Sequence, residues 1–201
     1  MKGLLLIWLF LGVGVEQLQA QENHYEVTLS SGFYQAPEYE HATHKLFLGA
    51  DFNYHIRKRW LVTIGFVNGQ FTYFDDYRSN VFSYDDYTNA KGRESHLYLT
   101  AAYSIVHTSQ FVVQIGSGLG QFTQRLSFPF QAPTSYGSPG LPGGTIFMAE
   151  LSYNALEVPL KFDAFYRLSK RIGVGLRVGA FLQFNRPLLG TYIGPQLRVG
   201  L

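Results

Sequence analysis

The chain has 201 residues, of which 46% are hydrophobic, 16% aromatic and only 15% charged, and its formal net charge is +2. It has no cysteine, which excludes a disulfide framework, a cysteine-ligated metal and a lipoprotein anchor, and its scattered Lys and Arg residues argue against a nucleic-acid partner. Its 17 Phe, 14 Tyr and 21 Gly residues favour strands over helices, so we expect one all-β domain.

The first twenty residues are typical of a secretory signal peptide. Lys2 precedes an apolar run from Gly3 to Val15, and a polar segment then ends at Ala20. This run is shorter than the roughly twenty apolar residues that a membrane-spanning helix needs. We therefore expect residues 1–20 to be removed and residues 21–201 to form the mature domain, with a retained anchor as the alternative.

Apolar side chains alternate with polar or small ones in eight segments of the mature chain, which predicts eight strands. The third segment loses its alternation near Asn68 and Gly69, where we expect a β-bulge. The eight segments are His24–Tyr34, Leu46–Ile56, Trp60–Val67, Leu97–Ile105, Phe111–Gly120, Leu156–Tyr166, Ile172–Gln183 and Tyr192–Leu201.

The connections between these segments alternate in length. They are long near residues 35–44, 74–92, 126–144 and 185–190, and tight at 57–59, 107–109 and 167–171. Four prolines in residues 126–144 indicate irregular backbone there. This alternation predicts an eight-stranded antiparallel up-and-down transmembrane β-barrel, with tight turns in the periplasm and long loops outside the cell. We expect a monomer in contact with outer-membrane lipid.

Outward aromatic residues gather beside the tight turns, as expected for an aromatic girdle at one membrane interface. The residues of this predicted girdle are Tyr25, Tyr54, Trp60, Tyr103, Phe111 and Tyr166.

The opposite face of the strands carries a nearly balanced set of charges that we expect to line the lumen. An eight-stranded barrel has room inside only for side chains, so these charges must pair, and a diffusion pore is not expected. The strand order predicts that Arg198 pairs with Glu26 and Arg177 with Asp163. The full predicted lumen network is Glu26, Asp51, Glu157, Lys161, Asp163, Arg177 and Arg198.

A secreted, soluble, lipocalin-like barrel is the structural alternative, because it would turn the apolar face inward around a ligand. The polar face of this chain is rich in Gly, Ser, Thr, Asn and Gln but has few Lys or Glu residues, unlike the surface of a soluble domain. We therefore predict that the apolar face meets lipid.

The mature chain resembles the small eight-stranded OmpX/OmpA-like outer-membrane barrels. Its segment Leu156–Phe162, LEVPLKF, resembles the L-E-[IV]-P-L-x-x motif of the outer membrane protein beta-barrel domain family, which includes PorT-like proteins. Residues Tyr192–Leu201 resemble the C-terminal signal read by the barrel-assembly machinery, although they end in Leu instead of an aromatic residue. The resemblance implies this fold, the cell outer membrane, insertion by that machinery and, for PorT-like relatives, an envelope or secretion partner; it implies no activity.

Two groups of polar residues are candidates for chemistry. His107 and Ser109 have the His-x-Ser spacing of lipid A deacylase barrels, but they lie in a predicted periplasmic turn. His41, His44 and His96 fall near the outer rim with the Asp75-Asp76 and Asp85-Asp86 pairs, where a divalent cation could bind. We expect solvated polar residues at both places, with no catalytic, cofactor-binding or metal-binding residue, and a lipid A modifying enzyme is the alternative.

Aromatic residues in the long loops are the candidates for contact with a partner. Exposed aromatic rings among polar residues suit protein contact, although rings that pack on one another as a rim cap are the alternative. The sequence thus predicts a non-enzymatic outer-membrane barrel whose outer loops contact a partner or the envelope. The contact candidates are Tyr77, Phe82, Tyr84, Tyr87, Phe128, Phe130 and Tyr136.

Overall fold

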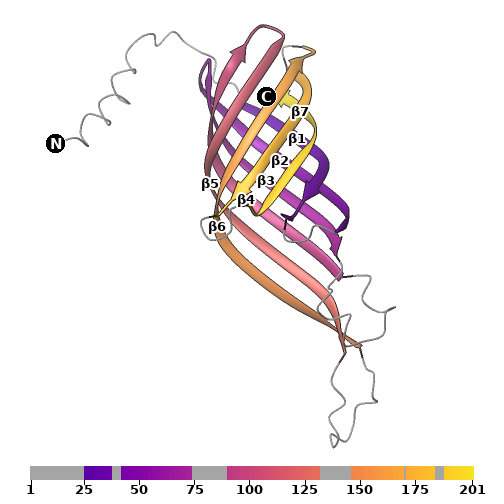
Figure 1. Ribbon diagram of the computed structural model, residues 1–201. Coiled ribbons are helices and arrows are strands. Elements are labelled where there is room, and N and C mark those ends of the chain that lie inside the picture. Colours follow the sequence, from indigo (N-terminus) through magenta and orange to yellow (C-terminus); the bar gives the residue numbers. More distant parts are fainter. Residues whose placement is uncertain (1–24, 38–41, 74–89, 132–145, 170, 184–187) are drawn as a thin grey trace, which may run out of the picture.

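The computed structural model describes residues 25–37, 42–73, 90–131, 146–169, 171–183 and 188–201, and they form one closed β-barrel (Figure 1). Each strand is antiparallel to the next, and β8 pairs with β1 to close the ring. The predicted eight-stranded up-and-down barrel is confirmed, and the predicted signal peptide lies outside the described residues. The strands are β1 (Tyr25–Gln35), β2 (Thr43–Arg57), β3 (Trp60–Tyr73), β4 (Ala90–His107), β5 (Phe111–Gln131), β6 (Ile146–Arg167), β7 (Ile172–Leu182) and β8 (Gly190–Gly200).

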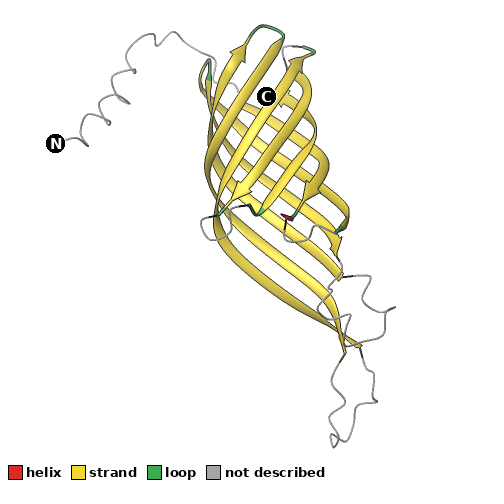
Figure 2. Cartoon of the chain, viewed as in Figure 1, coloured by secondary structure: helices red, strands yellow, loops and turns green. Residues whose placement is uncertain are grey.

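Most of the described chain is strand (Figure 2). No helix in the described ranges is long and apolar enough to cross a membrane.

The strands differ in length, and the difference makes the barrel asymmetric. β1, β7 and β8 have 11 residues each, whereas β5 has 21 and β6 has 22. The β5–β6 hairpin therefore extends beyond the rim at the end opposite the short turns, as the lower part of Figure 1 shows. We call the paired segments Gln121–Gln131 of β5 and Ile146–Glu157 of β6 the protruding hairpin.

The predicted long loop at residues 126–144 was wrong for residues 126–131, which continue β5, and β6 begins at Ile146 instead of Leu156. The proline in this part of β5 does not interrupt the pairing. Pro129 lies opposite Met148, and a residue without an N–H can occupy an antiparallel pair that exchanges no backbone hydrogen bonds. The proline content therefore gave no reliable sign of irregular backbone here.

The predicted bulge at Asn68 and Gly69 was also wrong, because the pairing runs without interruption through Phe47↔Gly69 and Leu48↔Asn68. The nearest register shift lies on β2, between Thr43 and Leu46. The alternation changes at Asn68 because this outward side chain lies beyond the apolar band, where it donates a hydrogen bond to Ser95 at 2.8 Å.

The barrel interior has two layers. The half nearer the short turns is polar and charged, and the half nearer the protruding hairpin is filled by aromatic rings. Glycines leave room for some of these rings: a Cβ atom on Gly69 would lie 2.5 Å from the Tyr34 ring, and one on Gly179 would lie 2.3 Å from the Tyr192 ring. We call the aromatic layer the aromatic cap; its residues are Tyr34, Phe47, Phe71, Tyr73, Tyr98, Phe122, Phe128, Phe181 and Tyr192.

Candidate functional site

The centre of the lumen holds an ion-pair network that joins strands from opposite sides of the barrel. Arg177 of β7 bonds Asp163 Oδ1 through Nε and Asp51 Oδ2 through Nη2, both at 2.7 Å. Lys161 of β6 donates to the same Asp51 oxygen at 2.9 Å and to the Thr63 hydroxyl at 3.1 Å. Arg177 and Asp51 are at most 2% exposed, so each charge depends on the others for its solvation.

A second ion pair lies nearer the short turns. Arg198 Nη1 is 3.1 Å from Glu26 Oε2, and His55 Nε2 lies 3.1 Å from the same oxygen. Arg198 also donates to Gln114 Oε1 at 3.0 Å, and its guanidinium lies over the Phe165 ring, 3.8 Å from the centroid. Both pairs expected from the strand order, Arg198 with Glu26 and Arg177 with Asp163, are thus within ion-pair distance. The seventh residue of the predicted network, Glu157, lies apart from them.

Glu157 belongs to a separate buried cluster whose His96 ring lies among Tyr34, Phe122 and Phe181 of the aromatic cap. Its Oε2 atom is 2.7 Å from Nδ1 of His96, and Nε2 of His96 is 2.8 Å from the Tyr34 hydroxyl. The Tyr34 hydroxyl donates to Glu94, whose other carboxylate oxygen accepts a 2.7 Å hydrogen bond from Gln124. The chain of contacts therefore crosses β1, β4, β5 and β6 in the interior.

The hydrogen bonds define which nitrogen of His96 donates. Tyr34 has a single hydroxyl hydrogen and gives it to Glu94, so Nε2 of His96 is the donor to the Tyr34 oxygen. One proton then lies between Nδ1 of His96 and Glu157. The His96 ring is 0% exposed and stacks on Phe181 with 3.6 Å between centroids, so substrates have no access to this cluster. Its geometry suits the joining of strands.

We expect Tyr34→Phe to lower the free energy of unfolding by about 1 to 3 kcal/mol, because it removes one hydroxyl that serves both Glu94 and His96 in the buried interior. Equilibrium unfolding in urea, with the barrel in lipid vesicles, measures this change. The matched control is Tyr153→Phe, which removes an exposed hydroxyl bonded to Gln183 and should change stability by less than about 0.5 kcal/mol. Equal effects for the two variants would contradict a structural role for the cluster.

The structure corrects the predicted place of His96, which is inside the barrel and not at the outer rim. His41 and both Asp pairs lie outside the described residues, and the side chain of His44 is not described. Among the side chains that are described, no group of three or more His, Asp or Glu residues is placed to hold a metal ion. His107 ends β4 beside a short turn, and Thr108 bonds the Phe111 backbone in that turn.

The predicted contact aromatics fall mostly in the long loops outside the described residues. Tyr77, Phe82, Tyr84, Tyr87 and Tyr136 lie outside the described residues, and Phe130 belongs to β5 without a described side chain. Phe128 is the exception, and its prediction as an exposed loop residue was wrong. It lies in β5, is 6% exposed and packs into the aromatic cap, because its inward position continues the lumen face of the strand.

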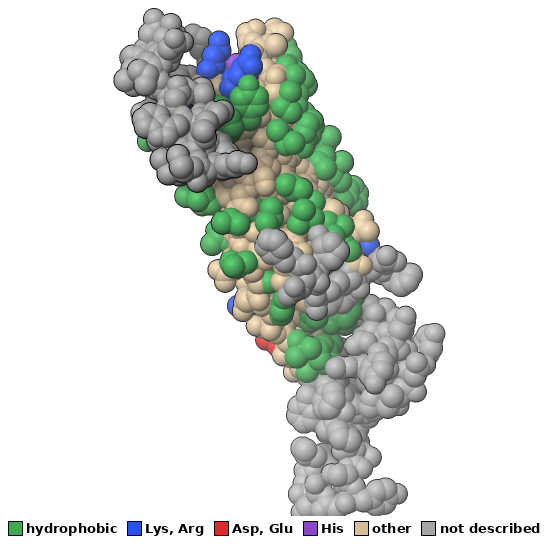
Figure 3. All heavy atoms as spheres, turned by 60° about the vertical axis from the view of Figure 1, so that its left-hand side comes forward, with side chains coloured by type: hydrophobic (Ala, Val, Ile, Leu, Met, Phe, Trp, Pro, Cys, Tyr) green, Lys and Arg blue, Asp and Glu red, His purple; other side chains and the backbone are tan. Residues whose placement is uncertain are grey.

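Every strand of the barrel carries exposed apolar side chains, and Figure 3 shows those on one face. On β6 the outward residues from Tyr166 to Leu156 are apolar or aromatic, and they are followed by Asn154, Ser152 and Glu150. On β5 the same change falls between Leu119 and Gln121. Beyond this level the two faces exchange character: the outward residues are mostly polar, with Met148 as an exception, and the inward residues are mostly apolar, with Gln124 as an exception. The exchange marks where the surroundings change from lipid to water.

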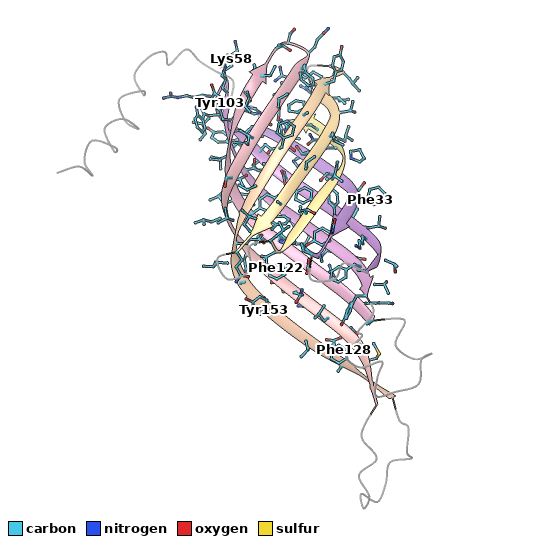
Figure 4. All side chains as sticks on the ribbon, in the orientation of Figure 1. Phe33, Lys58, Tyr103, Phe122, Phe128 and Tyr153 are labelled. Carbon is cyan, nitrogen blue, oxygen red and sulfur yellow. The ribbon has the colours of Figure 1, made fainter. Side chains whose placement is uncertain are left out.

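The six predicted girdle residues lie at the other limit of the band. Tyr103 is labelled near the short-turn end in Figure 4, whereas Phe122, Tyr153 and Phe128 are labelled toward the protruding hairpin. Tyr25 packs on Phe52 and Tyr54, and Trp60 packs on Tyr103, with ring centroids 5.0 to 5.6 Å apart. Tyr25, Trp60, Phe111 and Tyr166 each remain more than 40% exposed on the outside of the barrel. This distribution is typical of a membrane interface.

A closed eight-stranded barrel with an outward apolar band and a polar lumen is an outer-membrane β-barrel, which confirms the predicted class and location. No protein-family model matches the chain, and no curated protein sequence matches it.

Solved structures share the fold. Ail, the attachment invasion locus protein of Yersinia pestis, in complex with the heparin analogue sucrose octasulfate, aligns with a TM-score of 0.53 and 11% identity over 89% of this chain and 99% of its own. The N-terminal β-barrel domain of Pseudomonas aeruginosa OprF aligns with a TM-score of 0.51 and 11% identity over 89% of this chain and 98% of its own. The small outer-membrane barrel resemblance is therefore confirmed at the level of fold.

Proposed function

We propose that this protein is a non-enzymatic outer-membrane barrel with a closed, charge-paired lumen, and that its protruding hairpin binds an extended segment of a protein partner. One observation carries the proposal. The β6 segment Ile146–Glu157 pairs with β5 along one side, whereas β7 pairs with β6 only from Val158 onward. The other edge of this segment has no strand partner among the described residues.

The prolines define which backbone groups face this open edge. Pro159 lies opposite Phe181 of β7, and Pro129 lies opposite Met148. Neither proline has an N–H, so each occupies a pair that exchanges no backbone hydrogen bonds. At the two-residue period of a strand, the N–H and C=O groups of Met148 and Ser152 then point away from β5, toward the open edge. An edge of this kind is a template for an added strand.

Side chains beside this edge would give selectivity. Leu151 is on the inward face of the hairpin and is 56% exposed, and Tyr153 on the same face is 39% exposed. On the outward face Met148 is 61% exposed beside the charged Glu150. Backbone hydrogen bonds provide affinity in strand addition, and alternate side chains select the sequence. A partner segment with apolar residues at every second position fits this edge.

Two features support the other parts of the proposal. The ion pairs and the aromatic cap fill the lumen with side chains, which leaves transport by diffusion without a path. His96 is sealed in the interior, and His107 lies at the end opposite the protruding hairpin. The same fold in Ail, named an attachment invasion locus protein, is compatible with a contact function.

The test places a photo-crosslinking amino acid at Asn154, beside the open edge, in intact cells. We expect discrete cross-linked adducts that become at least fivefold weaker when Ser152→Pro is added, since proline removes an N–H directed at the partner. A crosslinker at Gln121, an outward residue of β5 that is flanked by two strands, should give none of these adducts.

A second proline variant separates loss of the edge from loss of the hairpin. Leu151→Pro removes an N–H directed at β5 and should weaken the hairpin itself, whereas Ser152→Pro should keep its proteolytic resistance. Adducts that persist unchanged in Ser152→Pro, or the absence of adducts at position 154, would contradict the proposed edge.

A further inference from the structure

The rim at the short-turn end carries a strongly basic set of side chains that the proposed function does not use. Arg57, Lys58 and Arg59 lie together where β2 turns into β3, and Arg167 and Arg171 flank the β6–β7 turn. Among the described residues at this end, Glu26 is the one acidic side chain, and it points inward to Arg198 and His55. Lys and Arg side chains are visible together at the upper end of Figure 3. The rim is therefore net positive.

The basic side chains lie directly beside residues that face lipid. Ile56 precedes Arg57 and is 54% exposed, and Trp60 follows Arg59 and is 46% exposed. At the second turn Leu168 is 61% exposed and Ile172 is 43% exposed, on either side of Arg171. Arg59 also donates to the hydroxyl of the girdle residue Tyr103, at 3.3 Å. Long cationic side chains in this position reach from the apolar band into the headgroup layer.

We propose that this basic rim binds the phosphate groups of anionic phospholipids in the adjoining leaflet. Attraction between basic side chains next to a membrane and an anionic lipid surface falls off within a Debye length, so the cations must lie at the level of the headgroups. The neighbouring aromatic and apolar residues hold them at that level. The proposal rests on the barrel crossing a bilayer and does not depend on a partner at the protruding hairpin.

An acidic segment of a soluble protein is the competing ligand, and the geometry disfavours it. Such a segment would need cations that project away from the membrane over the barrel mouth. Here Arg59 is instead bonded sideways to Tyr103, on the outer wall of the barrel. Lys58, labelled in Figure 4, shares the turn between β2 and β3 with Arg59, between the exposed residues Ile56 and Trp60. Arg59 and Arg171 directly precede Trp60 and Ile172, which are exposed on the outside of the barrel.

The test measures lipid selectivity of the whole barrel in vesicles of phosphatidylcholine that contain a minor fraction of phosphatidylglycerol. Electron paramagnetic resonance of spin-labelled lipids gives the association of each lipid with the protein surface. We expect phosphatidylglycerol to be preferred about fivefold, and the preference to fall toward one in Lys58→Gln/Arg59→Gln/Arg171→Gln. The charge-conserving variant Lys58→Arg/Arg59→Lys/Arg171→Lys should keep it.

Two results of the lipid-selectivity measurement would overturn the proposal. Selectivity that survives loss of the three charges would place the lipid site elsewhere on the barrel and overturn the proposal. The same holds if the charge-conserving variant loses selectivity as fully as the neutral one. A second measurement uses the unmodified barrel. High salt should abolish its preference for phosphatidylglycerol, and a preference unchanged by salt would also overturn the proposal.

Discussion

Arg177→Gln should lower the free energy of unfolding by about 3 to 5 kcal/mol. The substitution removes a cation that is 0% exposed and leaves Asp163 and Asp51 with fewer partners in the interior. An uncompensated buried charge has lost its water and gained no replacement, which is why removing one member of a buried pair costs more than the pair itself contributes. Urea unfolding in lipid vesicles, monitored by Trp fluorescence, measures the loss.

Two companion variants show whether the loss comes from the buried charge. Arg171→Gln removes an exposed cation from the adjoining turn and should change stability by less than about 0.5 kcal/mol. Adding Asp163→Asn to Arg177→Gln should restore part of the stability, because Asp51 and Lys161 then remain as a balanced pair at 2.9 Å. A cost below about 1 kcal/mol for Arg177→Gln would show that the network does not hold the lumen together.

Leu160→Arg should lower the free energy of unfolding by about 2 to 4 kcal/mol in lipid vesicles. Leu160 is an exposed outward residue in the middle of the apolar run on β6, so the new cation would face the lipid interior. In a soluble barrel the same residue would face water and the substitution would be nearly neutral. The sign and size of the effect therefore report the surroundings of the outward face.

Gln121→Arg is the matched control for this prediction. Gln121 is also outward and exposed, but it lies beyond the apolar band on β5. We expect its substitution to change stability by less than about 1 kcal/mol, as for charges near the interface. Similar losses for the two positions would mean that the apolar band does not mark the bilayer.

The barrel itself could be predicted because its strands obey a simple pattern. Leu156–Tyr166 separates apolar from charged residues at a period of two, and the register follows once neighbouring strands do the same. The predicted opposition of Asp163 and Arg177 is a direct consequence, since the two residues are cross-strand neighbours. Strand alternation carries this information without any knowledge of side-chain packing.

The protruding hairpin was not predicted, because its pattern inverts. Inside the membrane the outward residues are apolar, whereas beyond Leu156 the outward residues Asn154 and Ser152 are polar and Leu151 and Tyr153 face inward. A prediction that assigns one apolar face to each strand ends the β6 strand at this inversion. The alternation itself continues, and a search that allowed the faces to exchange would have found the extension.

The buried cluster around His96 was missed for a related reason. The predicted fourth strand began at Leu97 and the predicted loop ended at residue 92, so His96 and Glu94 were assigned to neither. Extending the strand by four residues places both of them on the lumen face with Tyr98. Their contacts with Tyr34 and Glu157 still could not be predicted, because they depend on how far neighbouring strands are staggered around the barrel.

Heat modifiability of the protein in the outer-membrane fraction tests the central claim most directly. Because the closed barrel survives detergent until it is boiled, we expect the protein in that fraction to migrate at different positions before and after boiling. Recovery in the soluble fraction, with one mobility under both conditions, would contradict a membrane-spanning barrel.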